Sequence, residues 1–208
     1  MNKQDLTIFK SFEDICRKTP SAPFLISPSR NQKGMTTFSY QETFEKANKI
    51  STIFLDNGYG NNLRVATLLG STPAHYIVKL ALNKIGVSVV PINPDYSPDE
   101  TAYLLADSGS VLAICTEHYM KQLKTAIAYK DLSIPIVTYD EIETIQTLKP
   151  LSDLGTQVHG KTEASLLYTS GTTGRPKGCM LSHEYELMCG EVYANIGAPI
   201  SLSFGKDK

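Results

Sequence analysis

Between residues 64 and 137, short apolar runs alternate with longer segments of helical length, and this alternation strongly restricts the possible folds. Four apolar runs are typical of buried strands: residues 64–69, 87–92, 111–115 and 134–137. Three segments of helical length separate them: residues 73–85, 98–107 and 117–129. Strands that alternate with helices form right-handed βαβ units around a parallel sheet. We therefore predict an α/β fold with a largely parallel sheet and flanking helices.

The residues before this alternation are predicted to form two more helices. Ile8, Phe12 and Ile15 follow the i, i+4, i+7 spacing of an amphipathic helix, and Thr7 is available as its N-cap. A short strand is expected at residues 23–27. The second helix is expected to bury four side chains along one side: Phe44, Ala47, Ile50 and Phe54.

The composition favours a globular intracellular protein. The 208 residues carry a formal net charge of −1 and 41% of them are hydrophobic, which allows a buried core and gives no basic surface for nucleic acid. No segment approaches the roughly 20 apolar residues of a membrane span, and the first residues do not resemble a signal peptide. The four cysteines form no CxxC pair and are expected to be reduced, half-buried thiols, which predicts a cytoplasmic location. The four histidines are equally scattered, so no zinc site is expected.

A glycine-rich segment at residues 170–178, SGTTGRPKG, has a composition that no buried core requires. It contains three glycines, three hydroxyl side chains and two cations, and apolar runs at residues 164–169 and 179–181 flank it. Glycines let the backbone approach a ligand, so that N–H groups and hydroxyls can donate to phosphate oxygens. Lys177 would add a positive charge beside the phosphates. We predict a β-hairpin over residues 164–183 whose loop binds phosphate; the alternative is a solvated surface hairpin without a ligand.

Residues 155–162 match a second nucleotide-binding pattern, G-x-x-x-x-G-K-[ST], in which Lys161 would contact the phosphates. That pattern functions between a buried strand and a helix. Here a polar segment with Pro150 precedes it and a predicted strand follows it. We therefore interpret residues 140–162 as a surface connection, with a nucleotide hydrolase that uses Lys161 as the alternative hypothesis.

Residues 168–178, YTSGTTGRPKG, resemble the phosphate-binding signature of the adenylate-forming superfamily, which includes acyl-CoA synthetases, adenylation domains of non-ribosomal peptide synthetases and luciferases. Two weaker similarities precede it in the superfamily's order: residues 38–42, FSYQE, and residues 82–94, LNKIGVSVVPINP. With the segment that continues to Cys115, the resemblance covers nearly the whole chain.

The resemblance implies a ligase that joins a carboxylic acid, of the fatty or another acyl class, to ATP. The products are acyl-AMP and pyrophosphate, and the acyl group then passes to coenzyme A or to the pantetheine of a carrier protein. The resemblance also implies Mg²⁺ between the phosphates. By position, the residues that would wrap the β- and γ-phosphates are Thr169, Ser170, Gly171, Thr172, Thr173 and Gly174, with Lys177 beside them. The forms of residues 93–94, Asn-Pro, and residues 182–183, Ser-His, favour a free-standing CoA ligase over a peptide-synthetase domain.

Sequences of this superfamily continue well past the signature, so residues 1–208 are interpreted as the N-terminal part of such an enzyme. The resemblance provides no residue here for the later acidic Mg²⁺ motif, the ribose-binding Asp or the lysine of the C-terminal lid domain. No catalytic residue and no metal ligand is therefore predicted, and the chain alone is expected to be inactive. A sheet cut within a domain exposes an edge and apolar faces, so self-association is expected. A non-catalytic binding domain of the same fold is the remaining alternative.

Overall fold

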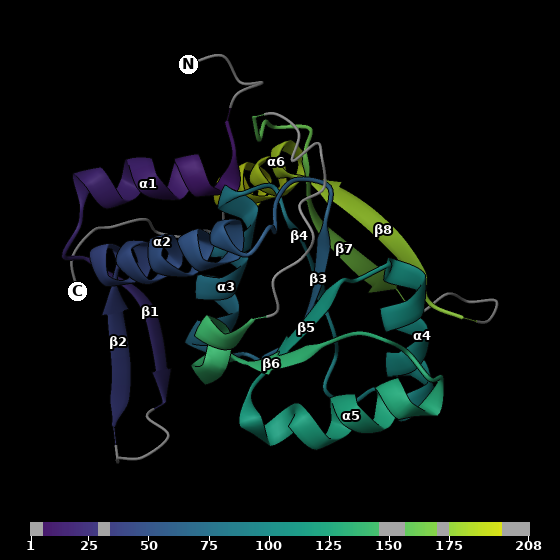
Figure 1. Ribbon diagram of the computed structural model, residues 1–208. Coiled ribbons are helices and arrows are strands. Elements are labelled where there is room, and N and C mark those ends of the chain that lie inside the picture. The colour runs from purple at the N-terminus through teal and green to yellow at the C-terminus, as the bar shows by residue number, and fades with distance from the viewer. Residues whose placement is uncertain (1–5, 29–33, 146–156, 170–174, 197–208) are drawn as a thin grey trace.

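The structure, a computed structural model, describes residues 6–28, 34–145, 157–169 and 175–196. Within these ranges, six strands form one sheet: β3 (Arg64–Leu68), β4 (Ser88–Pro91), β5 (Leu112–Cys115), β6 (Ile136–Thr138), β7 (Glu163–Thr169) and β8 (Lys177–Ser182). The strand order is β6-β5-β3-β4-β7-β8, and every neighbouring pair is parallel except β7 with β8. The predicted α/β fold with a largely parallel sheet is thus confirmed (Figure 1).

Helices cover both faces of this sheet (Figure 1). One face packs against α1 (Ile8–Lys18), α2 (Tyr40–Asp56) and α3 (Pro73–Lys84), and the other against α4 (Pro98–Ser108) and α5 (Met120–Tyr129). Successive side chains of a strand point to opposite faces. Val65 and Val89 accordingly join the core beneath α1 to α3, whereas Ala66 and Val90 join the core beneath α4 and α5. Burial on both faces explains why these strands are continuous apolar runs in the sequence.

Two antiparallel hairpins complete the fold. β7 and β8 form one at the edge of the sheet, as predicted, and α6 (His183–Asn195) follows β8 directly. The other joins β1 (Pro23–Pro28) to β2 (Met35–Ser39) in a separate two-stranded sheet. Only the first strand of that second hairpin is predictable from the apolar pattern of the sequence. β2 is mostly exposed, so it lacks the apolar pattern by which buried strands are recognised.

The first helix begins as predicted, because the Thr7 hydroxyl accepts a hydrogen bond from the backbone N–H of Lys10. Its buried face was predicted only in part: Phe12 is buried and Ile8 is partly buried against the core, but Ile15 is not. Ile15 is 45% exposed, and the buried side chains are Phe9, Phe12 and Cys16. Aromatic contacts set this orientation, since Phe9 stacks on a ring of α2 and Phe12 packs against rings of β1 and α2. The second helix buries Ala47, Ile50 and Phe54 as predicted, whereas Phe44 is only partly buried.

The remaining differences concern connections. The predicted helix at residues 117–129 begins as a short 3₁₀ helix, η2 (Glu117–Tyr119), before α5. A second 3₁₀ helix, η3 (Tyr139–Thr144), begins the connection that was predicted at residues 140–162. Residues 146–156 of that connection lie outside the described residues. None of the described helices is long and apolar enough to cross a membrane.

The four cysteines are free and differ in exposure. Cys16 and Cys115 are buried, and burial raises the pKa of the Cys115 thiol to about 11. Cys189 is half-buried, and Cys179 is exposed on β8. The prediction of half-buried thiols therefore holds only for Cys189.

Candidate functional site

The glycine-rich segment connects β7 to β8, and the register of this hairpin brings its two ends together. Thr169, the last residue of β7, pairs with Lys177, the first residue of β8, and both residues are exposed. The other five predicted phosphate-binding residues lie outside the described part of the chain: Ser170, Gly171, Thr172, Thr173 and Gly174. β7 runs parallel to β4, so Thr169 lies at the carboxyl end of a strand, where ligands bind in open α/β sheets.

Gly178 leaves space for two side chains of the neighbouring strand. It pairs with Tyr168, and a Cβ atom built on it would lie 3.3 Å from Cζ of Tyr168 and 3.0 Å from Cδ1 of Leu166. Such distances are shorter than most Cβ contacts in proteins, so a larger residue would displace one of these side chains. The glycine therefore allows the Tyr168 ring to lie across β8.

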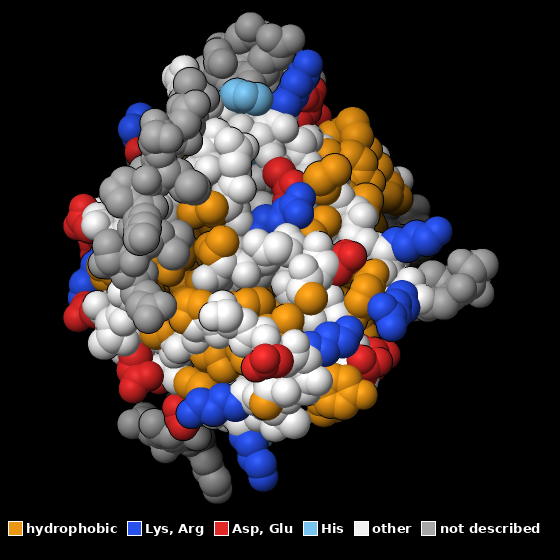
Figure 2. Space-filling view, turned by 45° about the vertical axis from the view of Figure 1, so that its right-hand side comes forward, with side chains coloured by type: hydrophobic (Ala, Val, Ile, Leu, Met, Phe, Trp, Pro, Cys, Tyr) orange, Lys and Arg blue, Asp and Glu red, His pale blue; other side chains and the backbone are white. Residues whose placement is uncertain are grey.

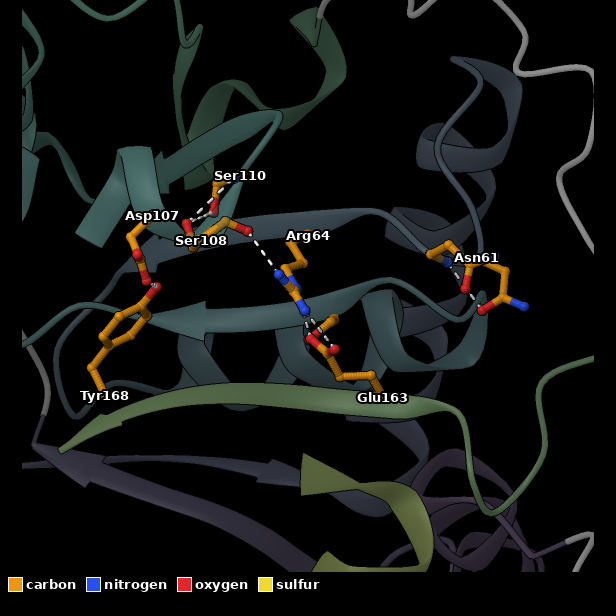
Figure 3. Close-up of polar contacts among 9 residues, drawn as sticks. Asn61, Arg64, Asp107, Ser108, Ser110, Glu163 and Tyr168 are labelled. Atoms are coloured by element: carbon orange, nitrogen blue, oxygen red, sulfur yellow. Dashed lines mark hydrogen bonds and ion pairs between the residues drawn. The ribbon is translucent and has the colours of Figure 1, made fainter. Parts of the chain in front are cut away.

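The Tyr168 side chain also contacts α4. Its hydroxyl donates a 2.6 Å hydrogen bond to Oδ2 of Asp107 (Figure 3), and its ring meets the ring of Tyr103 edge-on, with 6.5 Å between centroids. Burial and the nearby Asp107 carboxylate raise the pKa of the Tyr168 phenol, which therefore stays protonated at neutral pH. The guanidinium carbon of Arg175 lies 5.2 Å from the centroid of the Tyr103 ring.

The opposite end of β7 is held by a half-buried ion pair. Nε and Nη2 of Arg64 each donate a 2.8 Å hydrogen bond to one carboxylate oxygen of Glu163. Ser88 donates to the same carboxylate at 2.7 Å, and Nη1 of Arg64 donates to the backbone carbonyl of Ser108 at 3.1 Å (Figure 3). Burial alone would raise the pKa of Glu163, but the hydrogen bonds from Arg64 and Ser88 lower it below its usual value.

These groups line a cavity of about 310 Å³ beside the first residues of β3, β4 and β7. The cavity lies at the amino ends of the strands, away from Thr169 and Lys177. The Arg64 and Glu163 charges in its wall are hydrogen-bonded to one another. We therefore interpret the ion pair as a structural connection between β3, β4, α4 and β7.

The other face of β7 is tied to α3. Nζ of Lys79 donates to the Ser165 hydroxyl at 2.6 Å and pairs with Glu186 of α6 at 2.8 Å. Nδ2 of Asn83 donates to the backbone carbonyl of Ala164 at 2.8 Å. The strand that leads into the glycine-rich segment is therefore held on both faces and at its amino end.

The family of this chain follows from its match to a family model. Residues 12–198 match the model of the AMP-binding enzymes. The chain belongs to the AMP-binding enzyme family. The predicted membership of the adenylate-forming superfamily is thereby confirmed, and an enzymatic role as a ligase follows at the level of the family.

Curated relatives of this AMP-binding chain include peptide synthases. Tyrocidine synthase 2 of Brevibacillus parabrevis is 29% identical over 182 residues, which make up 88% of this chain and 5% of that protein. Gramicidin S synthase 2 of Brevibacillus brevis is 29% identical over 188 residues, 89% of this chain and 4% of that protein. The chain therefore spans about a twentieth of the length of these relatives.

Solved structures show the same fold. A fatty acyl CoA synthetase of Mycobacterium tuberculosis matches with a TM-score of 0.69 and 21% identity over 85% of this chain and 34% of that chain. The Klebsiella oxytoca NpsA N-terminal subdomain matches with a TM-score of 0.66 and 21% identity over 86% of this chain and 43% of that chain. At such identities the likeness concerns the fold alone.

One alternative for the AMP-binding chain, a nucleotide hydrolase that uses Lys161, can now be judged. Thr162 of the second nucleotide-binding pattern is followed directly by β7 and not by a helix, so the arrangement needed for Lys161 to contact phosphates is absent there. Among the described residues, no three His, Cys, Asp or Glu side chains are grouped to hold a metal ion.

The sequence alone does not reveal the side-chain contacts that the hairpin makes with its own strands and with α4. Tyr168 and Gly178 belong to the signature but received no role, and Asp107 appeared only as the end of a predicted helix. The Tyr168–Asp107 hydrogen bond joins residues 61 positions apart, and no local pattern indicates such a contact.

Proposed function

We propose that the protein containing this chain activates a carboxylic acid with ATP and transfers the acyl group to a pantetheine thiol. The observation that carries the proposal is the pairing of Thr169 with Lys177, which brings the two ends of the signature segment together at the carboxyl end of a sheet strand. Family membership supports the use of ATP.

In the proposed reaction, a carboxylate oxygen attacks the α-phosphorus of ATP, the bond to pyrophosphate breaks and acyl-AMP forms. The thiol then loses its proton to water as its sulfur attacks the acyl carbon, and AMP leaves with the electron pair of the broken C–O bond. Charge accumulates on the departing pyrophosphate, so positive groups and hydrogen-bond donors next to it favour the first step. We assign this task to Lys177, the Thr169 hydroxyl and residues 170–174, while Mg²⁺ bound with ATP neutralises further phosphate charge.

The proposal includes two thiol acceptors, coenzyme A and a pantetheine-loaded carrier protein, and both present a pantetheine thiol. The sequence favours coenzyme A through residues 93–94 and 182–183, whereas the curated relatives are peptide synthases, which supports a carrier-protein pantetheine. Assays of the longest protein that carries this sequence, with coenzyme A and with a pantetheine-loaded carrier protein, would separate the two acceptors. Thioester formation with neither would contradict the proposed transfer step.

Phosphate binding by residues 1–208 tests the carrying observation directly. Titration calorimetry with MgATP and with pyrophosphate is expected to show binding, and Lys177→Ala is expected to weaken it roughly 10- to 100-fold, because hydrogen bonds to charged groups contribute this much. Lys161→Ala is the matched control, since Lys161 is an exposed lysine of the alternative pattern. Loss of binding in the Lys161 variant with full binding in the Lys177 variant would overturn the assignment.

Residues 1–208 alone are expected not to catalyse acid-dependent exchange between ATP and pyrophosphate. The chain covers only 34% and 43% of the two matched solved chains described above, so much of a complete active site is expected elsewhere. Steady exchange by this chain would show that its own residues suffice.

A further inference from the structure

We propose that α4 positions the phosphate loop by holding the residues on both sides of it, with Asp107 acting on β7 and Tyr103 acting on Arg175, two positions before β8. The inference rests on the proposed function, because the loop must bind phosphate for its position to affect affinity. Asp107 and Tyr103 are assigned as positioning residues that act through Tyr168 and Arg175.

The contact to the incoming strand is short and specific. Tyr168 immediately precedes Thr169, and its hydroxyl lies 2.6 Å from Oδ2 of Asp107. This distance is typical of a hydroxyl that donates to a carboxylate, which is stronger than a hydrogen bond between neutral groups. The Tyr103 hydroxyl lies 3.4 Å from the other carboxylate oxygen, so Asp107 accepts from both tyrosines.

The contact just before β8 uses the same helix. Arg175 lies two positions before Lys177, and its guanidinium stands over the Tyr103 ring at 5.2 Å from the centroid. The ammonium of Lys130 lies 5.5 Å from the same centroid, so the ring carries two cations. Such contacts stabilise an arginine position even where water reaches it. Arg175 is thereby held on α4, which leaves Lys177 as the cation at the base of the loop.

Core packing alone does not account for this arrangement. The Tyr168–Asp107 hydrogen bond is solvent-exposed, and an apolar residue at position 168 could pack against the core beneath α4 and α5 without it. Gly178 keeps the surface of β8 open beneath the Tyr168 ring, which directs the hydroxyl toward α4. The contacts of α4 with the two strands therefore meet next to Thr169 and Lys177, the ends of the loop.

The test uses residues 1–208 with MgATP and pyrophosphate as probes. Tyr168→Phe, Asp107→Ala and Tyr103→Leu are expected to weaken binding about 3- to 10-fold each, as for loss of an exposed hydrogen bond or cation–π contact. They should also speed amide hydrogen exchange at residues 168–169 and 177–178. Asp107→Asn keeps an acceptor oxygen for the tyrosine hydroxyl, so it is expected to restore most of the affinity. Matched controls are Tyr129→Phe, an exposed tyrosine of α5, and Asp56→Ala at the end of α2.

The outcomes separate this inference from the proposed function. If the unaltered chain binds neither probe, the proposed function fails, and the exchange comparison still decides whether α4 restrains the two strands. If the unaltered chain binds and the variants bind equally well, the inference is overturned while the proposed function stands. Affinity that falls only together with the melting temperature, without rescue by Asp107→Asn, would assign α4 a merely structural role.

Discussion

His183 is a neutral imidazole enclosed at the junction of β8 and α6. The residue is fully buried, and its Nδ1 accepts a hydrogen bond from the backbone N–H of Ile8 at 3.3 Å. Nε2 therefore carries the hydrogen, and it has no partner among the described residues. Burial lowers the pKa of His183 to about 4; nearby Glu186 opposes the shift, and Lys79 and His159 add to it. An imidazole held in this way cannot accept a proton without losing the contact to the first helix.

The stability of the fold is expected to fall as the pH drops, because the unfolded chain binds a proton at His183 more readily than the folded chain. With a pKa of about 4 when folded and about 6.5 when unfolded, this residue should lower the free energy of unfolding by about 2 kcal/mol between pH 7.5 and pH 5. Urea denaturation across this range measures the effect.

Substitution of His183 separates its contribution to the pH dependence of stability from the contributions of other groups. His183→Gln should flatten the pH dependence, whereas His118→Gln, at an exposed histidine, should leave it unchanged. Equal pH dependence in the unaltered chain and the His183 variant would contradict the assignment.

At the scale of elements, the Arg64–Glu163 ion pair connects β3, β4, β7 and α4 through one carboxylate and one guanidinium. Glu163→Gln keeps the size of the side chain but leaves Arg64 without its charged partner. Because the pair is mostly buried, with side chains 28% and 24% exposed, we expect a loss of about 1–3 kcal/mol in the free energy of unfolding. Glu143→Gln is the control: the side chains of its pair with Lys49 are 63% and 70% exposed, so the loss should be much smaller than for Glu163→Gln. Equal losses in chemical denaturation would contradict this view of the pair.

The sequence predicts individual helices and strands better than it predicts which of them lie next to one another. The runs at residues 64–69 and 87–92 are recognisable because both faces of these strands are buried. The hairpin over β7 and β8 was predictable because a polar glycine-rich segment interrupts two apolar runs. The place of β7 beside β4 was not, since strand pairing depends on contacts such as Ser88–Glu163 between residues that are 75 positions apart. Asp107 was missed for the same reason.

At the scale of the whole molecule, one region exposes many apolar side chains. Met180 on the edge strand β8 is 67% exposed, and α6 adds further exposed apolar residues. Figure 2 shows that apolar side chains gather in several places on the face of the molecule that it draws. The exposed apolar side chains of α6 and its C-cap are Tyr185, Met188, Val192, Tyr193 and Ile196. An edge strand with apolar surroundings favours association between chains.

Residues 1–208 are therefore expected to self-associate with increasing concentration, and Met180→Lys should shift the equilibrium toward monomer. A charge on the edge strand disfavours pairing with a second strand. Sedimentation velocity over a range of concentrations measures the change. Ile26→Lys, at a 60% exposed position of β1, is the matched control and should have a smaller effect. A chain that stays monomeric at every concentration would contradict this expectation.

The strand order also has a consequence for the time course of folding. From β3 to β6, each strand joins a neighbour close in the sequence, whereas β7 must return across the sheet to pair Ser165 with Val89. Closing a long loop costs conformational entropy before any stabilising contact forms, so such pairings form slowly. The hairpin with the signature thus docks onto an edge of β4 that earlier segments have already built. During synthesis from the N-terminus, that edge of β4 therefore remains unpaired until β7 has been made.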